Sequence, residues 1–206
     1  MIKRLLLVIL ILILGVAGYY WYMFSRKSGG NSGPKQAPLA VSTHSDKFNG
    51  HIGGLMNAYF DMKAAFVEAD SVKAKEACRK MQQLIDSVDL KEIKARDTLP
   101  VFLSDSMFLA SMKDNAKTLL QQTDITEMRM SFKDLSENLY PFLKGIHYSG
   151  IPLYWQSCPM AFGEGRSANW ISNSMEIINP YLGKHHPEYK AGMLNCGEIQ
   201  DTIKAQ

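Results

Sequence analysis

The chain has few cysteines and lacks the short motifs of the common enzyme classes. Only three of its 206 residues are cysteine, and no two are spaced C-x-x-C, which disfavours thiol-disulfide exchange. There is no HExxH motif, no GxGxxG or P-loop motif, and no alternation of strand and helix patterns. No histidine stands beside a cysteine in sequence, and no paired carboxylates stand out. The sequence therefore predicts neither an enzyme nor an organic cofactor.

A basic surface is also lacking once the amino terminus is set aside. The formal net charge of +3 arises from 23 basic and 20 acidic residues. Four of the basic residues, Lys3, Arg4, Arg26 and Lys27, flank the first apolar segment, and no acidic residue precedes Ser28. The remainder holds 19 basic and 20 acidic residues, so we expect no nucleic-acid partner.

The one long apolar run is LLLVILILILGVAGYYWYMF, from Leu5 to Phe24. A helix of that length measures about 30 Å, which predicts a transmembrane helix with the membrane as a partner. The aromatic residues 19–22, followed by two basic residues, are typical of a membrane interface. The small residues Val16-Ala17-Gly18 leave a cleaved signal peptide as the alternative. We favour a retained anchor, because apolar character continues beyond that point.

Both interpretations export the residues from about Ser28 onward. We therefore expect a single-pass inner-membrane protein with its carboxy-terminal domain in the periplasm, or a secreted or periplasmic protein after signal cleavage. The expected parts are an anchor or signal segment over residues 1–27, a flexible linker over 28–47, and a domain over 48–206. The linker assignment rests on the many Gly, Ser and Pro residues between 25 and 46.

Residues from about Asn49 to Gly145 show the apolar spacing of four amphipathic helices. Asp70 or Ser71 can cap the second helix, and D-x-x-E at Asp124 predicts a capping box for the fourth. The apolar faces are Ile52, Leu55, Met56, Tyr59, Phe60, Phe66 and Val67, interrupted by Lys63; Ala74, Ala77, Cys78, Met81, Leu84, Ile85 and Val88; Phe108, Met112, Ala116, Leu119 and Leu120; and Ile125, Met128, Phe132, Leu135, Leu139 and Phe142.

The connections between these helices are short or moderate. "RDTLPVFLS" is interpreted as a break before a third helix over about 104–122, and Pro141 and Gly145 end or kink the fourth. Four such helices predict a mainly α fold, an antiparallel four-helix bundle preceded by the N-terminal transmembrane helix. Cys78 falls on an apolar face, where we expect an inert buried thiol.

The composition and the hydrophobic pattern of the sequence change after Gly145. Residues 146–197 hold four of the eight prolines and show no long amphipathic period. "YWQSCPMAF", "ANWIS" and "MEIINP" are typical of short extended segments joined by turns. This tail, over residues 146–200, predicts a small β-containing or irregular lobe packed on the bundle.

The tail holds two pairs of sulfur-containing residues. Cys158 and Met160 flank Pro159, which favours an extended chain in which both side chains point the same way. Met193 and Cys196 are three apart, the spacing of neighbours on a helical turn. The pairs predict a four-sulfur site if the ends of the tail meet. Thiolates and thioethers favour Cu(I), whereas zinc usually takes Cys and His.

Other donors and other uses of these sulfurs stay open. His185 and His186 are further candidate metal ligands, and with His147 they could bind Cu(II) or zinc. Alternatively, Cys158 and Cys196 form a structural disulfide, which would close a long loop and stabilise the tail by about 4 kcal/mol. Methionine is also an ordinary core residue, and the chain has twelve.

The tail resembles a signature known from exported domains of unknown function in Bacteroidota, which also occur fused to the adaptor subunits of copper/silver efflux pumps. The shared motifs are Cys158-Pro159-Met160, Trp170-Ile171-Ser172, Asn179-Pro180-Tyr181-Leu182-Gly183 and Met193-Leu194-Asn195-Cys196-Gly197. "LMNAYFDMKAAFVEADSVKAKEAC" is similar to the opening of the same family, so the resemblance covers about residues 48–200.

The resemblance implies a helical domain with a metal-related role and metal-efflux or metal-donor proteins as partners. This chain departs from the family by the inserted "KHHPEYKAG", which holds His185 and His186. We expect a metal-binding domain that sequesters or transfers Cu(I) through Cys158, Met160, Met193 and Cys196, with Trp155, Trp170 and Tyr181 as a shield against water. A structural or protein-interaction module with a Cys158–Cys196 disulfide is the alternative.

Overall fold

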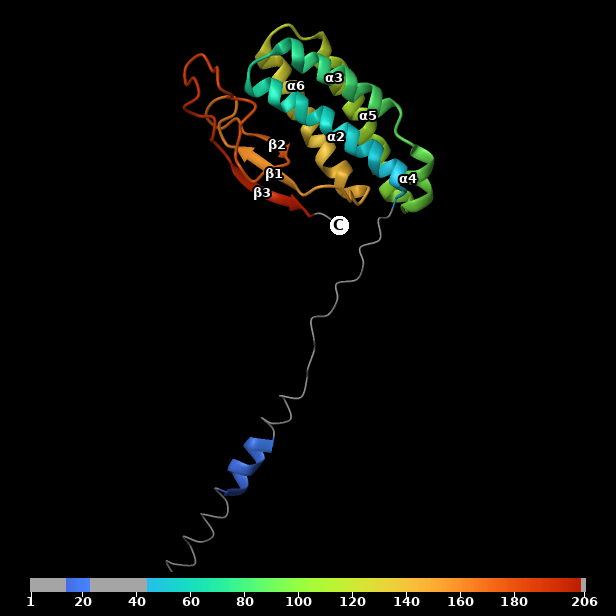
Figure 1. The fold of residues 1–206 in the computed structure, drawn as a ribbon, viewed down its shortest axis with the longest axis vertical. Coiled ribbons are helices and arrows are strands. Elements are labelled where there is room, and N and C mark those ends of the chain that lie inside the picture. Colours follow the sequence, from blue (N-terminus) through green and yellow to red (C-terminus); the bar gives the residue numbers. More distant parts are fainter. Residues whose placement is uncertain (1–13, 23–43, 205–206) are drawn as a thin grey trace, which may run out of the picture. The chain divides into compact units, whose positions relative to one another are not determined.

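The computed structural model describes residues 14–22 and 44–204 (Figure 1). The chain divides into two compact units, Met1–Ala40 and Val41–Gln206. Residues 14–22 of the first unit are helical. The described part of the second unit holds the helices α2 to α6 followed by the strands β1 to β3. The proposals below concern this second unit.

Short polar residues begin the helices of the second unit. The side chains of Ser45, Asp70, Asp89 and Asp124 each accept a hydrogen bond from a backbone N–H in the first turn of the helix that follows. α2 packs against α3, α3 against α5, and α5 against α6. The helices are α2 (Asp46–Val67), α3 (Ser71–Asp86), α4 (Leu90–Arg96), α5 (Leu99–Gln121) and α6 (Ile125–Gly145).

The predicted four-helix bundle with a transmembrane helix is wrong. The described residues contain six helices, counting residues 14–22, and the additional helix of the second unit is α4. "RDTLPVFLS", which we interpreted as a break, holds the end of α4 and the first turn of α5. Asp89 starts α4 by accepting from the backbone of Lys91 and Glu92. Pro100 fits the first turn of α5, where a missing N–H costs nothing.

The predicted transmembrane helix, Leu5 to Phe24, is likewise not supported. Within residues 14–22 and 44–204, no helix has the length and apolar character needed to cross a membrane. Residues 5–13 and 23–24 of the predicted span lie outside the described residues. Most of the predicted linker, residues 28–43, also lies outside them, and the last residues of the linker belong to α2.

The tail forms a three-stranded antiparallel sheet in the order β2-β1-β3. Its strands are β1 (Leu153–Cys158), β2 (Ala168–Ser172) and β3 (Glu198–Ile203), and the pairing of β1 with β3 shifts register between Trp155 and Gln156. The predicted extended character is confirmed for "YWQSC" and "ANWIS". "MEIINP" forms no strand: it begins with a bend, continues as irregular chain and ends in a turn, and β3 was not predicted.

The sheet packs on α6, and hydrogen bonds join it to α2 (Figure 1). The Tyr59 hydroxyl from α2 accepts a hydrogen bond from the Ile171 backbone N–H at 3.0 Å and lies 2.8 Å from the Ser136 hydroxyl of α6. Lys63 Nζ donates to Ser172 Oγ at 3.1 Å, so the one charged residue of the first apolar face joins α2 to β2. The hydrophobic core extends from Phe48 to Ile203. The second unit contains this whole core, and we expect it to fold on its own.

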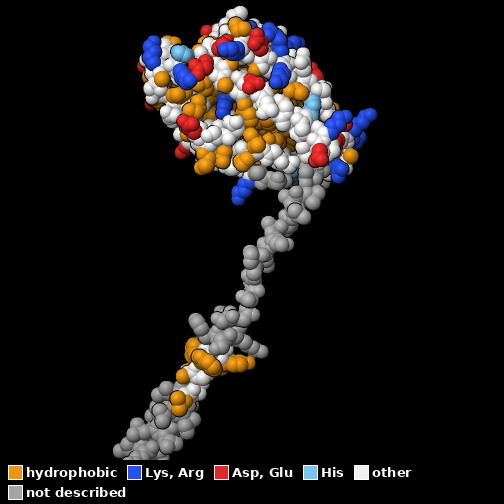
Figure 2. Space-filling view, in the orientation of Figure 1, with side chains coloured by type: hydrophobic (Ala, Val, Ile, Leu, Met, Phe, Trp, Pro, Cys, Tyr) orange, Lys and Arg blue, Asp and Glu red, His pale blue; other side chains and the backbone are white. Residues whose placement is uncertain are grey.

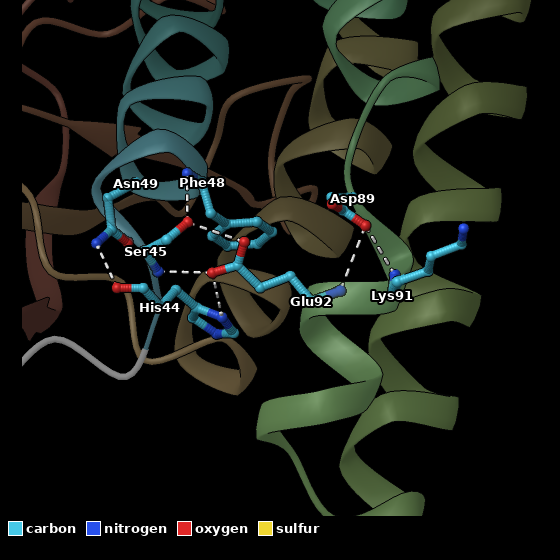
Figure 3. Close-up of polar contacts among 7 residues, drawn as sticks. All are labelled: His44, Ser45, Phe48, Asn49, Asp89, Lys91 and Glu92. Atoms are coloured by element: carbon cyan, nitrogen blue, oxygen red, sulfur yellow. Dashed lines mark hydrogen bonds and ion pairs between the residues drawn. The ribbon is translucent and has the colours of Figure 1, made fainter.

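The first described residues of this unit are held by α4 (Figure 3). Ser45 donates from its backbone N–H and its hydroxyl to the two carboxylate oxygens of Glu92, at 2.6 and 2.9 Å. The Ser45 hydroxyl oxygen also accepts from the Phe48 N–H at 3.2 Å, which caps α2. The ring of His44 packs on that of Phe48, with centroids 4.4 Å apart. Glu92 of α4 therefore fixes the start of α2.

Candidate functional site

The fold brings Cys158 and Cys196 together. Their sulfurs are 2.9 Å apart, although 38 positions separate the residues, and both are free thiols. Cys158 ends β1 and is fully buried, while Cys196 lies just before β3 and is half-buried. The pairing of β1 with β3, in which Ser157 faces Glu198, carries Cys196 back to the end of β1.

Gly197 permits the close approach of Cys196 to β1. Its φ of +144° is a backbone conformation that other residues rarely adopt. A Cβ at this position would lie 2.6 Å from the Ser157 carbonyl oxygen and 3.0 Å from the Trp170 ring. The tail motif therefore needs glycine after Cys196, because a larger residue would not fit beside the thiol pair.

Asn179 organises the loop that carries Cys196. This side chain is fully buried, and its Nδ2 donates to the Cys196 carbonyl oxygen at 2.9 Å. Its Oδ1 accepts from the backbone N–H groups of Tyr181 and Leu182, at 2.8 and 3.1 Å. Its own backbone N–H donates to the Leu194 carbonyl at 2.8 Å. One asparagine thus joins the Asn-Pro-Tyr-Leu-Gly turn to the Met-Leu-Asn-Cys-Gly segment.

Arg129 and Gly183 fasten the same turn to the end of α2. The Arg129 guanidinium donates to the Pro180 carbonyl at 3.0 Å and to the Phe66 carbonyl at 2.7 Å. Burial lowers the pKa of Arg129 to about 10. Gly183 has a φ of +60°, and a Cβ there would lie 2.7 Å from the Val67 carbonyl oxygen. The last carbonyls of a helix need such partners, and here the tail and α6 provide them.

Three of the other four predicted ligands lie at a different hollow. Met160, His185 and His186 line a hollow of about 370 Å³ between the start of α6 and the loop after Tyr181, and neither cysteine lines it. Met193 is partly buried in the turn before Cys196, where its carbonyl accepts from the Cys196 N–H at 3.0 Å. The fold thus brings the donor atoms of the two cysteines into contact and places Met160, His185 and His186 at a separate hollow.

Met160 departs from the predicted geometry because β1 ends at Cys158. Pro159 and Met160 form a turn, in which the Gly163 N–H donates to the Met160 carbonyl at 3.2 Å. The argument that Cys158 and Met160 point the same way required an extended chain through residue 160. The chain leaves the extended conformation at Pro159, one residue before Met160, so the premise of that argument is absent here.

The hollow around the histidines does not suit a bare cation. His185 Nε2 lies 3.5 Å from a Glu68 carboxylate oxygen. His186 Nδ1 faces the backbone N–H groups of Glu188 and Tyr189 at 3.3 and 3.2 Å, which leaves only Nε2 of that ring for other partners. Arg129, Arg166 and Glu188 also line the hollow, so two positive charges and one negative charge surround it, and the excess of positive charge opposes a further cation. Across residues 14–22 and 44–204, no three His, Cys, Asp or Glu side chains are grouped to hold a metal ion.

Cys158 is shielded from water, and Cys196 is partly shielded. Burial, and then the hydrogen bond with Cys158, raises the pKa of Cys196 to about 11. The ring of Trp170 is fully buried next to this site and meets Tyr181 edge-on at 5.9 Å. Trp155, which we expected in the same shield, stacks instead on Tyr140, with ring centroids 4.4 Å apart.

Cys78 lies apart from this pair. It is fully buried in α3, and burial raises the pKa of its thiol to about 12. Its Sγ lies 3.6 Å from the Ala116 carbonyl oxygen of α5. The predicted burial of this thiol is confirmed, and it serves below as a control for the thiol pair.

Residues 55–149 match the sequence model of a family described as protein of unknown function (DUF3347). The matched range begins within α2 and ends just after α6, so it covers less than half of the chain and stops before β1. The helical part of the resemblance is thereby supported. No curated protein and no solved structure gives a significant match.

The residues that position the thiol pair were not predicted from the sequence. Arg129 lies between Ile125 and Phe132 in the apolar period of α6. A charged residue at a position with core spacing could have indicated that Arg129 is buried. Asn179 precedes a proline, a pair typical of turns in which the asparagine side chain bonds the backbone that follows. Neither pattern identifies the groups to which Arg129 and Asn179 are hydrogen-bonded.

Proposed function

We propose that this domain binds a soft metal ion, Cu(I), through the thiolates of Cys158 and Cys196. Met160 and Met193 are the candidate thioether ligands, and His185 and His186 are further donors that would require the loop to move. The domain would sequester the ion or transfer it to metal-efflux or metal-donor proteins outside the cytoplasm. The observation that carries the proposal is the 2.9 Å separation of the two sulfurs.

The chemistry of the pair supports this choice. Two thiolates form a soft donor set, and the methionines beside them in sequence favour Cu(I) over zinc. Metal–sulfur bonds of about 2.3 Å at a tetrahedral centre hold two sulfurs about 3.8 Å apart. The thiols would therefore separate by about 1 Å when an ion enters. Cys196 is half-buried in a loop, so it can move more easily than Cys158, which is fixed in β1.

The resemblance to domains fused to copper/silver efflux adaptors also supports binding of Cu(I). It supports a site on the exported side of the membrane and partners in metal efflux. A buried site beside Trp170 and Tyr181 would keep water and oxidants from Cu(I).

Titration with Cu(I) tests the proposal. The reduced fragment of residues 41–206 is titrated against a competing Cu(I) chelator, beside the Cys158→Ser, Cys196→Ser double variant. We expect one ion per chain, and an affinity at least about 100-fold lower in the double variant, because both thiolates are lost. Cys78→Ala, which removes a buried thiol outside the pair, should keep the affinity of the unaltered fragment. Equal binding by the double variant and the unaltered fragment would refute the proposal.

The same contact favours one alternative, a structural or interaction module whose tail is closed by a Cys158–Cys196 disulfide. A disulfide needs the sulfurs about 2.05 Å apart, which is also within 1 Å of the separation seen. The closed loop would stabilise the tail by about 4 kcal/mol. Mass spectrometry of protein isolated from its own compartment, with and without reductant, distinguishes the two functions. A disulfide in every molecule supports the structural module, and free thiols support metal binding.

A further inference from the structure

The hollow that Met160, His185 and His186 line has the size of a small-molecule site. Its volume is about 370 Å³, and sites for small organic ligands start at about 300 Å³. Separate segments meet around it: the first two turns of α6, the turn after β1, the loop after Asn179, and Ala69 behind α2. Figure 2 shows basic side chains and a histidine together over that loop, at the upper left of the view, with acidic side chains beside them.

Arg129 brings a buried positive charge to the wall of the hollow. The residue is only 5% exposed. Its Nε and Nη2 donate to the carbonyl oxygens of Pro180 and Phe66, whereas Nη1 has no hydrogen-bond partner among the described residues and stays accessible to solvent. Burial lowers the pKa of Arg129, and the Asp124 carboxylate opposes that shift without forming an ion pair, since it caps α6. Buried charges in proteins are normally paired, so this guanidinium has a donor to offer to an anion.

A second guanidinium, that of Arg166, lines the same hollow. A tight turn holds this residue: its backbone N–H donates to the Gly163 carbonyl at 3.1 Å, and its carbonyl accepts from the Phe162 N–H at 3.1 Å. The acidic residue of the lining is Glu188, whose carboxylate raises the pKa of the neighbouring Tyr189 hydroxyl. Within residues 14–22 and 44–204, neither arginine forms an ion pair with a carboxylate. Two arginines and one glutamate therefore leave one positive charge uncompensated.

His186 presents a hydrogen-bond donor. Its Nδ1 accepts from the backbone N–H groups of Glu188 and Tyr189, so the proton of the neutral ring is on Nε2. Stacking on the Tyr189 ring, with centroids 4.7 Å apart, holds this orientation. An N–H group binds an anion, whereas a metal ion would need the lone pair that Nε2 does not have in this tautomer. His186 and the two arginines thus favour a ligand of the same charge.

The remainder of the lining is largely apolar. Met130, Met160 and Phe162 are partly buried, and the Phe162 ring packs on that of Tyr181, with centroids 5.3 Å apart. A cavity of about 150 Å³ can hold benzene, so this hollow has room for an aromatic ring together with a charged group. Sites for small organic ligands combine an apolar lining with a few polar groups in this way.

We propose that the hollow binds a small organic monocarboxylate whose apolar body packs on the methionine and aromatic side chains. The carboxylate accepts hydrogen bonds from Nη1 of Arg129, the guanidinium of Arg166 and Nε2 of His186. Guanidinium groups match the two oxygens of a carboxylate. One negative charge balances the site, whereas a phosphate, with nearly two near pH 7, would leave an excess beside Glu188. The proposal does not depend on metal binding, because neither cysteine of the thiol pair lines the hollow.

Calorimetric titration of the full chain with benzoate, under reducing conditions and without metal ions, tests the proposal. Benzoate has about nine non-hydrogen atoms, and we expect one site with a dissociation constant on the order of 100 µM. Benzyl alcohol keeps the ring without the charge, acetate keeps the charge without the ring, and inorganic phosphate carries more charge. Each of these three should bind at least about tenfold more weakly. No binding of benzoate up to about 5 mM, or binding of any of the three as tight as that of benzoate, would overturn the proposal.

Two variants locate the site. Arg166→Gln removes one donor, and His186→Phe removes another but keeps a ring to stack on Tyr189. Each should weaken benzoate binding at least about fivefold, the loss expected for a hydrogen bond to a charged group. Lys190→Gln is the matched control, because Lys190 is exposed in the same loop and does not line the hollow, so its replacement should leave the affinity unchanged. Unchanged affinity in either variant, or an equal loss in Lys190→Gln, would refute the site.

Arg129 is followed without replacing it, because its loss would also release the carbonyls of Pro180 and Phe66 and so would not separate binding from folding. Its Nε–H signal in ¹⁵N nuclear magnetic resonance spectra should shift with added benzoate, along the same binding curve as the heat. The backbone amides of residues 160–166 and 185–189 should shift with it. Shifts confined to other parts of the chain would place the bound benzoate elsewhere and overturn the proposal.

Discussion

Replacing Asp105 by asparagine should stabilise the folded domain above neutral pH and leave it nearly unchanged in acid. Asp105 lies on α5 and is only 1% exposed. Its Oδ2 has no hydrogen-bond partner among the described residues, and its carboxyl group faces Gly145 at the carboxy-terminal end of α6. Burial, and next the Asp97 carboxylate, raises the pKa of Asp105 to about 7. His44, whose pKa burial lowers, also lies near Asp97.

The sign of the effect follows from proton linkage. With a pKa near 3.8 when unfolded and about 7 when folded, Asp105 holds a proton only in the folded state between these values. The free energy of unfolding therefore falls as pH rises through this range, by about 1.4 kcal/mol per pH unit and by about 4 kcal/mol at most. Asparagine stays neutral and removes this loss. We expect Asp105→Asn to gain about 2–4 kcal/mol at pH 8 and close to zero at pH 4.

Urea unfolding of residues 41–206 at pH 4.5, 6 and 8 measures this difference. Asp61→Asn, at an exposed position of α2, is the control, and its effect should stay within about 0.5 kcal/mol at every pH. If Asp105→Asn shifts the free energy of unfolding by the same amount at pH 4.5 and pH 8, the carboxyl group is not protonated in the folded state and the reasoning fails.

Three further substitutions are measured by the same assay. Gly183→Ala should cost at least about 2 kcal/mol, because φ is +60° and the new Cβ would meet the Val67 carbonyl, whereas Gly50→Ala, with open space around it in α2, should stabilise by about 0.5–1 kcal/mol. Burial lowers the pKa of Lys63 to about 8. Between pH 8 and about 10.5 the unfolded chain therefore binds a proton that the folded chain lacks. The free energy of unfolding rises with pH over this range. Lys63→Met should therefore stabilise the fragment by about 1–3 kcal/mol at pH 7 and flatten this rise; a loss of stability at pH 7 would show that the bond to Ser172 outweighs burial of the charge.

The helices could be predicted because their apolar faces repeat over many turns. The face through Ile52, Tyr59 and Phe66 is buried as expected. The predictions that failed concerned shorter segments. α4 has only one buried residue, Ile93, which is too little for a period to be seen, although the Asp89 cap was visible in the sequence. Local caps decide such short helices, while periodicity decides long ones.

The thiol pair could be predicted only as a possibility, because its geometry depends on contacts between distant segments. The spacing of Cys158 and Cys196 leaves open whether β3 returns to β1, and β3 itself is exposed along most of its length and shows no apolar alternation. The extended geometry expected at Met160 is absent for a local reason, since the turn at Pro159 ends the strand. Resemblance to a family motif identified which residues matter in the tail, and only the fold shows which of them meet.

The structure also explains why the motif includes residues that are not sulfur ligands. Asn179 bonds the carbonyl of Cys196, Arg129 bonds the carbonyl of Pro180, and Gly183 meets the end of α2. These contacts form a continuous path from the helices to the half-buried thiol. Entry of a metal ion and closure of a disulfide both require Cys196 to move by less than about 1 Å relative to Cys158. One cysteine lies in a strand and the other in a loop that the side chains of Asn179 and Asn195 hold to the preceding segment. This arrangement allows a small movement of Cys196 while it keeps the two sulfurs together.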